Sequence, residues 1–220
     1  MLALASAMLA QPPKGYSIPL IDVSAETSRQ VIVDREPGQY LGHPTTALLP
    51  DGKTMLIVYP KGHGKGAISY KRSADGGRTW SGRLPVPENW ATSLATPTIH
   101  WISPRRLILF SGLYPIRMAE SNDNGASWSP LAKIGDYGGI VAMSSVVLLS
   151  NGNLLAAFHD DGRFLHNAGK TDRFIVYKTV SSNNGHTWSE PSVVVSHPEA
   201  RLCEPGIIRS PDGRQLAMLL

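Results

Sequence analysis

Side chains that can transfer protons stand beside several predicted strands of this 220-residue sequence. Asp160 and Asp161 are paired carboxylates in one loop, where they can act as an acid or hold a hydroxyl group. The same pair can instead cap a solvated turn. His63 lies in a glycine-rich loop, and because imidazole titrates near neutral pH it can serve as an acid–base group or simply belong to a flexible loop. These residues predict acid–base chemistry, each with a structural alternative.

Metal binding is a second chemistry to weigh. His43, His63 and His159 could together hold a metal ion, but their spacing matches no metal motif. Cys203 is the single cysteine, which excludes an intrachain disulfide or a thiolate cluster. We therefore expect no metal site and no cofactor.

The strands that must position these residues are marked by an eight-residue turn motif. It reads Ser-x-(Asp/Asn)-x-Gly-x-(Ser/Thr)-Trp and occurs at residues 73–80, 121–128 and 181–188. An Asp or Asn side chain closes a turn on backbone N–H groups, the glycine supplies positive φ, and the tryptophan can bury against a sheet. Three unrelated turns would not share one frame. The motif therefore predicts a repeat protein.

A second repeat lies out of phase with the first. Four segments, which begin at His43, Thr96, Ser144 and Glu204, each read as a short strand and a turn that lead into a more apolar strand. Those apolar strands are predicted at residues 54–59, 107–110, 154–158 and 215–220, and third strands at 67–71, 116–119 and 174–178. Four strands in about 50 residues are typical of a propeller blade. No segment predicts an amphipathic helix, so the predicted fold class is all-β, a β-propeller of four-stranded blades.

The remaining segments complete the predicted organisation. Residues 1–11 resemble the apolar part of a signal peptide without its basic region, which favours a secreted or periplasmic protein over a disordered or truncated start. Residues 12–39 are predicted to lead into the fold, with one strand at 30–33, and residues 40–220 to form the propeller. Because soluble proteins avoid open sheet edges, half a fourth blade suggests a longer reading frame, or else pairing with another copy.

Composition excludes some partners. The sequence is 42% hydrophobic and 17% charged, as in ordinary globular proteins. The net charge of +4 comes from scattered Lys and Arg, so we expect no nucleic acid partner, while an anionic small substrate is compatible. No apolar run reaches the roughly 18 residues of a membrane span. The oligomeric state is not indicated.

The aligned strand starts predict where a site would form. The innermost strands of propeller blades begin around one mouth, so His43, Thr96, Ser144 and Glu204 should surround it. The loops after the second strands open nearby and add His63, Tyr114 and residues 158–163. We therefore predict His43, Thr96, Ser144 and Asp161 as substrate-binding residues.

With turn motifs between the third and fourth strands of successive blades, residues 40–220 resemble the sialidase superfamily of Asp-box, or BNR-repeat, proteins. The resemblance implies a six-bladed β-propeller, of which this chain holds about three and a half blades. It also implies a retaining exo-glycosidase: a tyrosine attacks the anomeric carbon, a glutamate assists it, and an aspartate acts as acid and base. Three arginines bind the substrate carboxylate, which their guanidinium groups match in shape.

This pattern is only partly kept. Glu204, in Cys203-Glu204-Pro205-Gly206, resembles the segment that carries the family's glutamate, although it can also be a solvated carboxylate at a strand end. Alignment on Pro44 puts Gly42 where the first arginine belongs, and Arg35 offers a weaker local match. The loop at residues 60–66 lacks the acid–base aspartate. The predicted catalytic residues are therefore Glu204, His63 and Asp160, with Arg35 as a further substrate-binding residue.

Two functions follow from these predictions. The first is a secreted, sialidase-like exo-glycoside hydrolase that removes a terminal sugar, which can be acidic, from glycans. Because Gly42 replaces the arginine, a different sugar is favoured over strict sialic acid specificity. The alternative is a non-catalytic propeller that binds a glycan or a protein.

Overall fold

The computed structural model describes residues 19–165, 169–171 and 173–220, so the signal-like residues 1–11 lie outside the described part. The chain divides into two units, residues 1–31 and residues 32–220. The described part of the first unit holds one short 3₁₀ helix, η1 (Thr27–Arg29), without buried residues. The strand predicted at residues 30–33 is wrong: these residues pair with no other strand, and the division between the units falls among them.

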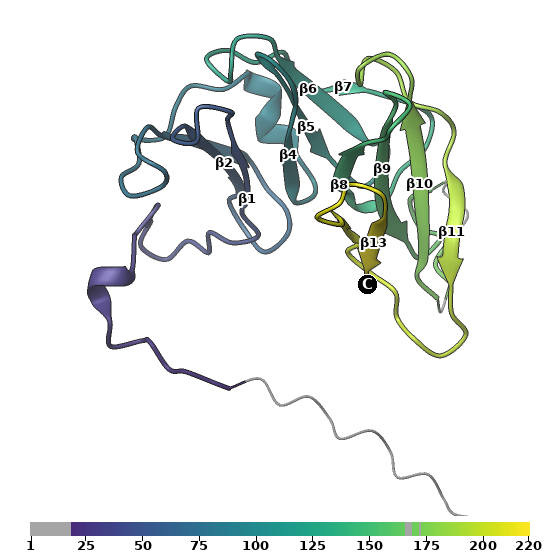
Figure 1. Cartoon of the computed structure of the whole chain (residues 1–220), viewed down its shortest axis with the longest axis horizontal. Helices are drawn as coiled ribbons and strands as arrows, with labels where there is room; N and C mark the ends of the chain where they lie inside the picture. Colours follow the sequence, from purple (N-terminus) through teal and green to yellow (C-terminus); the bar gives the residue numbers. More distant parts are fainter. Residues whose placement is uncertain (1–18, 166–168, 172) are drawn as a thin grey trace, which may run out of the picture. The chain divides into compact units, whose positions relative to one another are not determined.

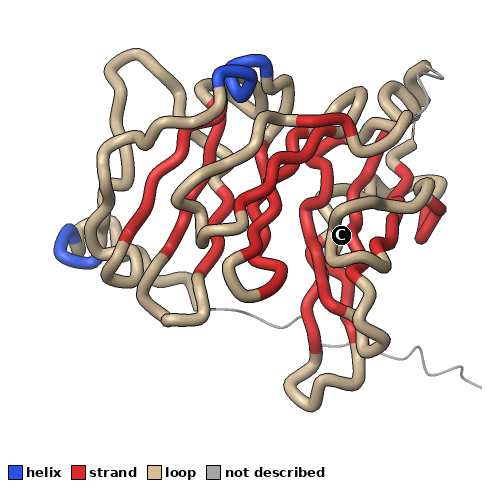
Figure 2. Tube along the Cα trace, turned by 90° about the horizontal axis from the view of Figure 1, so that it is seen from above, coloured by secondary structure: helices blue, strands red, loops and turns tan. Residues whose placement is uncertain are grey.

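The second unit consists of four antiparallel sheets in which the strands follow one another in chain order. The first sheet contains β1 (Thr45–Leu48), β2 (Met55–Pro60) and β3 (Ile68–Ser73), and the second contains β4 (Pro97–Ser103), β5 (Arg106–Ser111), β6 (Arg117–Ser121) and β7 (Ala132–Lys133). The third contains β8 (Ile140–Leu148), β9 (Leu154–Asp160), β10 (Ile175–Ser181) and β11 (Ser192–Ser196), and the fourth β12 (Gly206–Arg209) and β13 (Leu216–Leu219). One 3₁₀ turn, η2 (Glu88–Thr92), lies between the first two sheets (Figures 1 and 2). The all-β class is confirmed.

The first strands of successive sheets contact one another: β1 with β4, β4 with β8, and β8 with β12. Hydroxyl groups join them in a repeated way. The Thr45 hydroxyl donates to the Pro97 carbonyl and accepts from the Ile99 N–H, both at 3.1 Å. Between the third and fourth sheets, the Ser144 hydroxyl donates to the Pro205 carbonyl at 2.8 Å, and the Ser145 hydroxyl accepts an N–H from the next sheet at 2.9 Å. The sheets are therefore arranged like consecutive blades.

Two apolar clusters fill the space between these sheets, and β5 contributes to both. Because alternate side chains of a strand point to opposite faces, Leu107 and Leu109 join the cluster shared with the first sheet. Ile108 and Phe110 join the cluster shared with the third sheet. All four side chains are fully buried. Burying such a side chain stabilises the fold by about 1.5–3 kcal/mol, so β5 holds its neighbours on both sides.

The first sheet departs from the predicted four strands. After its turn motif the chain makes two backbone–backbone bonds to β3, from Ser81 N to Arg72 O and from Leu84 N to Tyr70 O, both 2.9 Å, and the Ser81 hydroxyl accepts from Arg72 N at 3.1 Å. Pro85 and Pro87 follow and provide no N–H to extend the ladder. The region therefore remains an irregular edge and not a strand.

The three turn motifs share a pattern of hydrogen bonds, except that in the third motif the Asn183 amide donates to the Thr187 hydroxyl and does not accept from it. In the second motif, Asp123 Oδ1 accepts from the Ser121 hydroxyl at 2.7 Å and from Ser127 N at 2.9 Å, and Asp123 Oδ2 accepts from the Ser127 hydroxyl. The glycine of the motif faces the preceding sheet: a Cβ atom on Gly125 would lie 2.6 Å from Leu56 Cδ1. The motifs thus close hairpins and also pack one sheet against the next.

Candidate functional site

Each sheet has two ends of different character. We call the end where the first strands begin the strand-start end, and the opposite end, which carries the turn motifs, the turn-motif end. At the strand-start end, the loop that follows a second strand meets the segment that leads into the next sheet. Leu113 and Gly139 exchange N–H bonds in this way, at 2.8 and 3.1 Å, between the second and third sheets. Gly64 likewise lies beside Thr96: a Cβ atom added to Gly64 would be 3.7 Å from Thr96 Oγ1.

Among the residues with left-handed backbone conformations at the strand-start end, three recur at equivalent positions of their sheets. The φ angles are +51° at His43, +54° at Met143 and +52° at Glu204. Each residue stands two positions before a first-strand residue that begins the continuous pairing with the second strand, namely Thr45, Ser145 and Gly206. Positive φ is uncommon in residues other than glycine and costs free energy. The first strands of these three sheets therefore share a left-handed residue before their pairing begins, which the sequence does not reveal.

The recurring left-handed conformation shows that the sequence alignment of the third sheet with the other sheets was wrong by one residue. Met143, which is fully buried, occupies the position equivalent to His43 and Glu204, and Ser144 follows it. The Ser144 hydroxyl bonds the carbonyls of Pro205 and Ala157. In the second sheet the equivalent residue is Thr96, which is buried. Ser144 and Thr96 thus lie at the strand-start end as predicted, within the contacts that join the sheets.

Glu204 combines an exposed side chain with an anchored backbone. Its N–H donates to Nδ1 of His159 at 3.1 Å, although 45 residues separate the two in sequence. Burial lowers the pKa of His159 to about 4, so the ring is neutral at pH 7. A neutral ring that accepts at Nδ1 carries its proton on Nε2. His159 is 2% exposed and also packs against Phe174, with ring centroids 5.0 Å apart, so it is a rigid support for Glu204.

The paired carboxylates Asp160 and Asp161 are turned into the protein. Asp160 Oδ2 accepts N–H bonds from Gly162, Phe164 and Leu165 at 2.7–3.2 Å, while Oδ1 is buried and accepts no bond from the described residues. Burial raises the pKa of Asp160 above its ordinary value. Both carboxylates therefore hold the loop after β9 in shape.

Asp161 is 2% exposed and binds Arg163 Nε at 2.8 Å. Burial acts to raise the pKa of Asp161, but the hydrogen bonds from Arg163 outweigh it and keep that pKa below its ordinary value. The carboxylate is thus ionised and paired, with the more exposed Arg163 on its outer side.

His43 and His63 come together at the first sheet. Their rings meet edge to face, with centroids 4.6 Å apart, and His63 is the more exposed of the two. Tyr40, which the sequence analysis did not select, lies 5.4 Å from His63 between ring centroids. Within the described part of the chain, no hydrogen bond or ring contact joins this group to His159 and Glu204. The predicted residues therefore form two groups at the strand-start end.

Arg35 is exposed beside an ion-pair cluster of the first sheet. Its neighbours Asp34 and Glu36 bind Arg83 at 2.6 and 2.5 Å, and Glu36 also binds Lys61 at 3.2 Å. Asp34 accepts a further hydrogen bond from the Tyr59 hydroxyl. The cluster fastens the segment around Arg35 to the sheet. Its role was not apparent from the sequence, because the partners are 25 to 49 residues apart.

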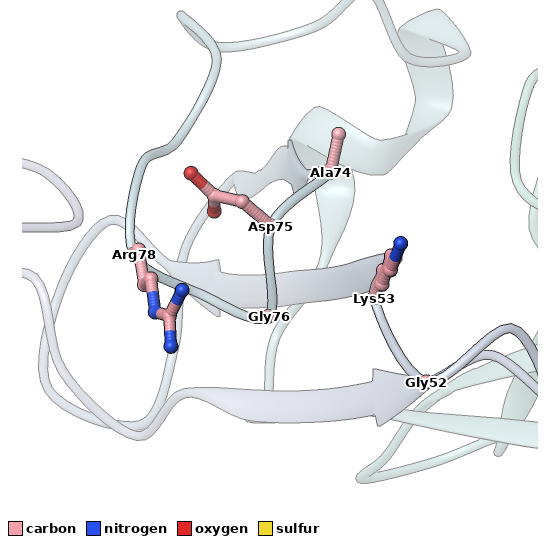
Figure 3. Close-up of a pocket in the computed structure, with 6 residues that line it drawn as sticks. All are labelled: Gly52, Lys53, Ala74, Asp75, Gly76 and Arg78. Carbon is pink, nitrogen blue, oxygen red and sulfur yellow. The ribbon is translucent and has the colours of Figure 1, made fainter.

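A hollow at the turn-motif end of the first sheet carries no comparable chemistry. It is lined by Gly52, Lys53, Ala74, Asp75, Gly76 and Arg78 (Figure 3). Both carboxylate oxygens of Asp75 already accept bonds from Ser73 and Thr79 of the motif. The hollow is thus a product of the turn.

No group of three or more His, Cys, Asp or Glu side chains among the described residues is arranged to hold a metal ion. No helix formed by these residues is long and apolar enough to cross a membrane.

Comparison with known proteins places this architecture in a family. Residues 23–217 match the BNR repeat-like domain, and the chain therefore belongs to that family. The resemblance to sialidase-like BNR-repeat proteins is confirmed. No curated protein matches the sequence.

Several solved structures are similar. A protein of unknown function from Dyadobacter fermentans has a TM-score of 0.61 at 12% identity, over 83% of this chain and 62% of that one. An α-L-arabinofuranosidase of Fusarium graminearum has a TM-score of 0.57 at 16% identity, over 81% of this chain and 55% of that one. The NanB sialidase of Streptococcus pneumoniae has a TM-score of 0.52 at 15% identity, over 80% of this chain and 27% of that one. This chain thus spans less than two thirds of each, and at these identities the likeness concerns the fold.

Proposed function

We propose that this protein is a secreted glycoside hydrolase of sialidase-like, six-bladed fold that removes a terminal sugar from glycans. The observation that carries the proposal is Glu204: an exposed carboxylate on a left-handed backbone, held by His159 at the start of a first strand. A backbone conformation of this cost is kept where the surroundings enforce it, as they often do at functional sites. The similarity to two glycoside hydrolases supports the same reading.

In the proposed reaction Glu204 acts as the general base. Hydrolysis breaks the bond between the anomeric carbon and the glycosidic oxygen, adds the hydroxyl of water to the carbon and transfers a proton to the departing oxygen. Glu204 takes up the proton from the attacking group, because its carboxylate is exposed and a carboxylate oxygen can accept a proton. His63 supplies the proton to the leaving group, since it is the exposed imidazole of the loop that lacks an aspartate. Asp160 serves by shaping the loop after β9.

Release of the aryl group from a panel of aryl glycosides, including the sialoside and the arabinofuranoside, tests this proposal. On the substrate that is cleaved, Glu204→Gln should lower kcat by about 100-fold or more, since general base catalysis contributes roughly that factor. Glu199→Gln is the matched control, because Glu199 is exposed five residues earlier and should leave kcat unchanged. Full turnover by Glu204→Gln would show the assignment to be wrong. No hydrolysis, together with glycan binding, would favour the non-catalytic alternative.

A further inference from the structure

The side chain of Tyr40 occupies an unusual place at the strand-start end. It is 54% exposed, and its ring folds back over the chain at Gly42. A Cβ atom on Gly42 would lie 2.4 Å from Tyr40 Cε1 and 2.6 Å from Tyr40 Cζ. Only glycine leaves room for the ring there, so the position of the ring and the identity of residue 42 depend on each other.

The backbone around Tyr40 is fixed by the loop that carries His63. Leu41 forms bridges with Lys61 and Gly62. Those contacts bring the Tyr40 ring beside His63 at an interplanar angle of 44°, and the His43 ring meets His63 edge to face at 88°. The result is an exposed aromatic surface bordered by two imidazoles, each of which can donate or accept hydrogen bonds.

The charge near this surface is largely balanced. Lys61 is paired with Glu36 at 3.2 Å, and Glu36 is shared with Arg83. Lys65 is the exposed cation of the same loop. A clamp for a carboxylate needs a planar guanidinium group or several converging donors. The residues around Tyr40 present instead an apolar ring and imidazole nitrogens that can form hydrogen bonds.

We propose that Tyr40, His43 and His63 form a subsite for an uncharged sugar ring. The C–H face of the sugar lies on the Tyr40 ring, and the imidazoles bind its hydroxyl groups. Binding sites commonly combine apolar and aromatic walls with a few polar groups that fix orientation. This inference deepens the proposed function and rests on it for the reaction, but binding can be measured without turnover.

Fluorescently labelled protein on an array of neutral and sialylated glycans gives the first test, and titration calorimetry with the best neutral oligosaccharide gives the second. Tyr40→Ala should weaken binding about tenfold, which equals 1.4 kcal/mol. Tyr40→Phe keeps the ring and should stay within about threefold of the wild type. Trp101→Ala, which removes another exposed aromatic side chain (37% exposed) in β4, is the control and should bind normally.

Gly42→Ala tests the position of the ring. The added Cβ must displace Tyr40, so Gly42→Ala should weaken binding like Tyr40→Ala, and the double variant should be no worse than Tyr40→Ala. Unchanged near-UV circular dichroism will verify folding. Undiminished binding by Tyr40→Ala, preference for sialylated glycans, or no binding to any neutral glycan would overturn the subsite. Glu204→Gln should bind normally, so a failed catalytic assignment leaves this test intact.

Discussion

The strand-start end and the turn-motif end use the same kinds of side chain in opposite ways. At the turn-motif end, Asp123 is bonded on both oxygens within its own motif. At the strand-start end, the carboxylate of Glu204 is exposed while its backbone is strained and anchored from another sheet. Saturated hydrogen bonding stabilises a fold but leaves nothing to react. The difference supports the proposal that the turn-motif end stabilises the fold and that the strand-start end binds the substrate.

The first prediction breaks the packing at the turn-motif end. Gly125→Ala should lower the free energy of unfolding by about 2–4 kcal/mol, because the new Cβ meets Tyr70 Oη at 2.5 Å in addition to the strain of φ +79°. Gly77→Ala has a similar φ of +86°, but its Cβ meets the flexible Met55 Sδ at 3.1 Å. It should cost only about 1–2 kcal/mol. Urea unfolding measures both, and equal losses would contradict an inter-sheet role for the motif.

The second prediction separates the two ends by pH. The folded-state pKa of His159 is about 4, below that of an unfolded histidine. The unfolded state therefore binds more protons, and the stability is complete above pH 6.5 and lost as the pH falls through 6.5 towards 4. We expect His159 to account for about 2 kcal/mol of the loss between pH 7 and pH 4.5.

Urea unfolding at the two pH values measures that loss, and His159→Phe should reduce its pH dependence by the same amount. His159→Phe leaves the Glu204 N–H without its acceptor. Its kcat should therefore be lower than that of the wild type on the same substrate, with little change in KM. An unchanged pH dependence in His159→Phe would exclude this histidine as the source.

The third prediction concerns the turn-motif carboxylates. Their effect on the free energy of unfolding is smaller than that of His159 and appears at lower pH. Hydrogen bonds from Ser127 lower the pKa of Asp123 to about 2, so its contribution is present above pH 3.8 and lost as the pH falls through 2. Asp123→Asn should change the unfolding free energy at pH 7 by no more than about 0.5 kcal/mol, because the third motif already works with Asn183.

Asp123→Ala, which has no acceptor, should cost about 1–2 kcal/mol and serves as the contrast. Acid titration followed by circular dichroism should show that Asp123→Asn has lost part of the transition below pH 4. A loss at pH 7 as large as that of Asp123→Ala would contradict the interchange of Asp and Asn.

Much of the fold was predictable because its signals are local. Most second and third strands lie within one to three residues of their predicted positions, since apolar runs and turn residues define them. The strand at residues 30–33 was predicted from its composition alone, but a strand also requires a partner, and none is present. The same requirement explains the irregular edge of the first sheet, where Pro85 and Pro87 provide no N–H groups for pairing.

The candidate site was less predictable. The sequence predicted His43 and Glu204 from their alignment with strand starts and His63 from the loop after a second strand, and these signals are local. It did not indicate that Asp160 is bonded by three backbone N–H groups, that His159 holds Glu204, or that Tyr40 covers Gly42. These contacts depend on how loops of different sheets meet, which no short segment encodes.

The sequence alone determined the turn motifs, since the side-chain hydrogen bonds of Ser121, Asp123 and Ser127 close within eight residues and form wherever the segment is placed. The tertiary structure alone decided the conformation of Glu204. Its positive φ has an intrinsic cost, and the support comes from a histidine 45 residues away that packing has buried and kept neutral. Local hydrogen bonds fix a turn, whereas a strained backbone is maintained by the packing of the whole molecule.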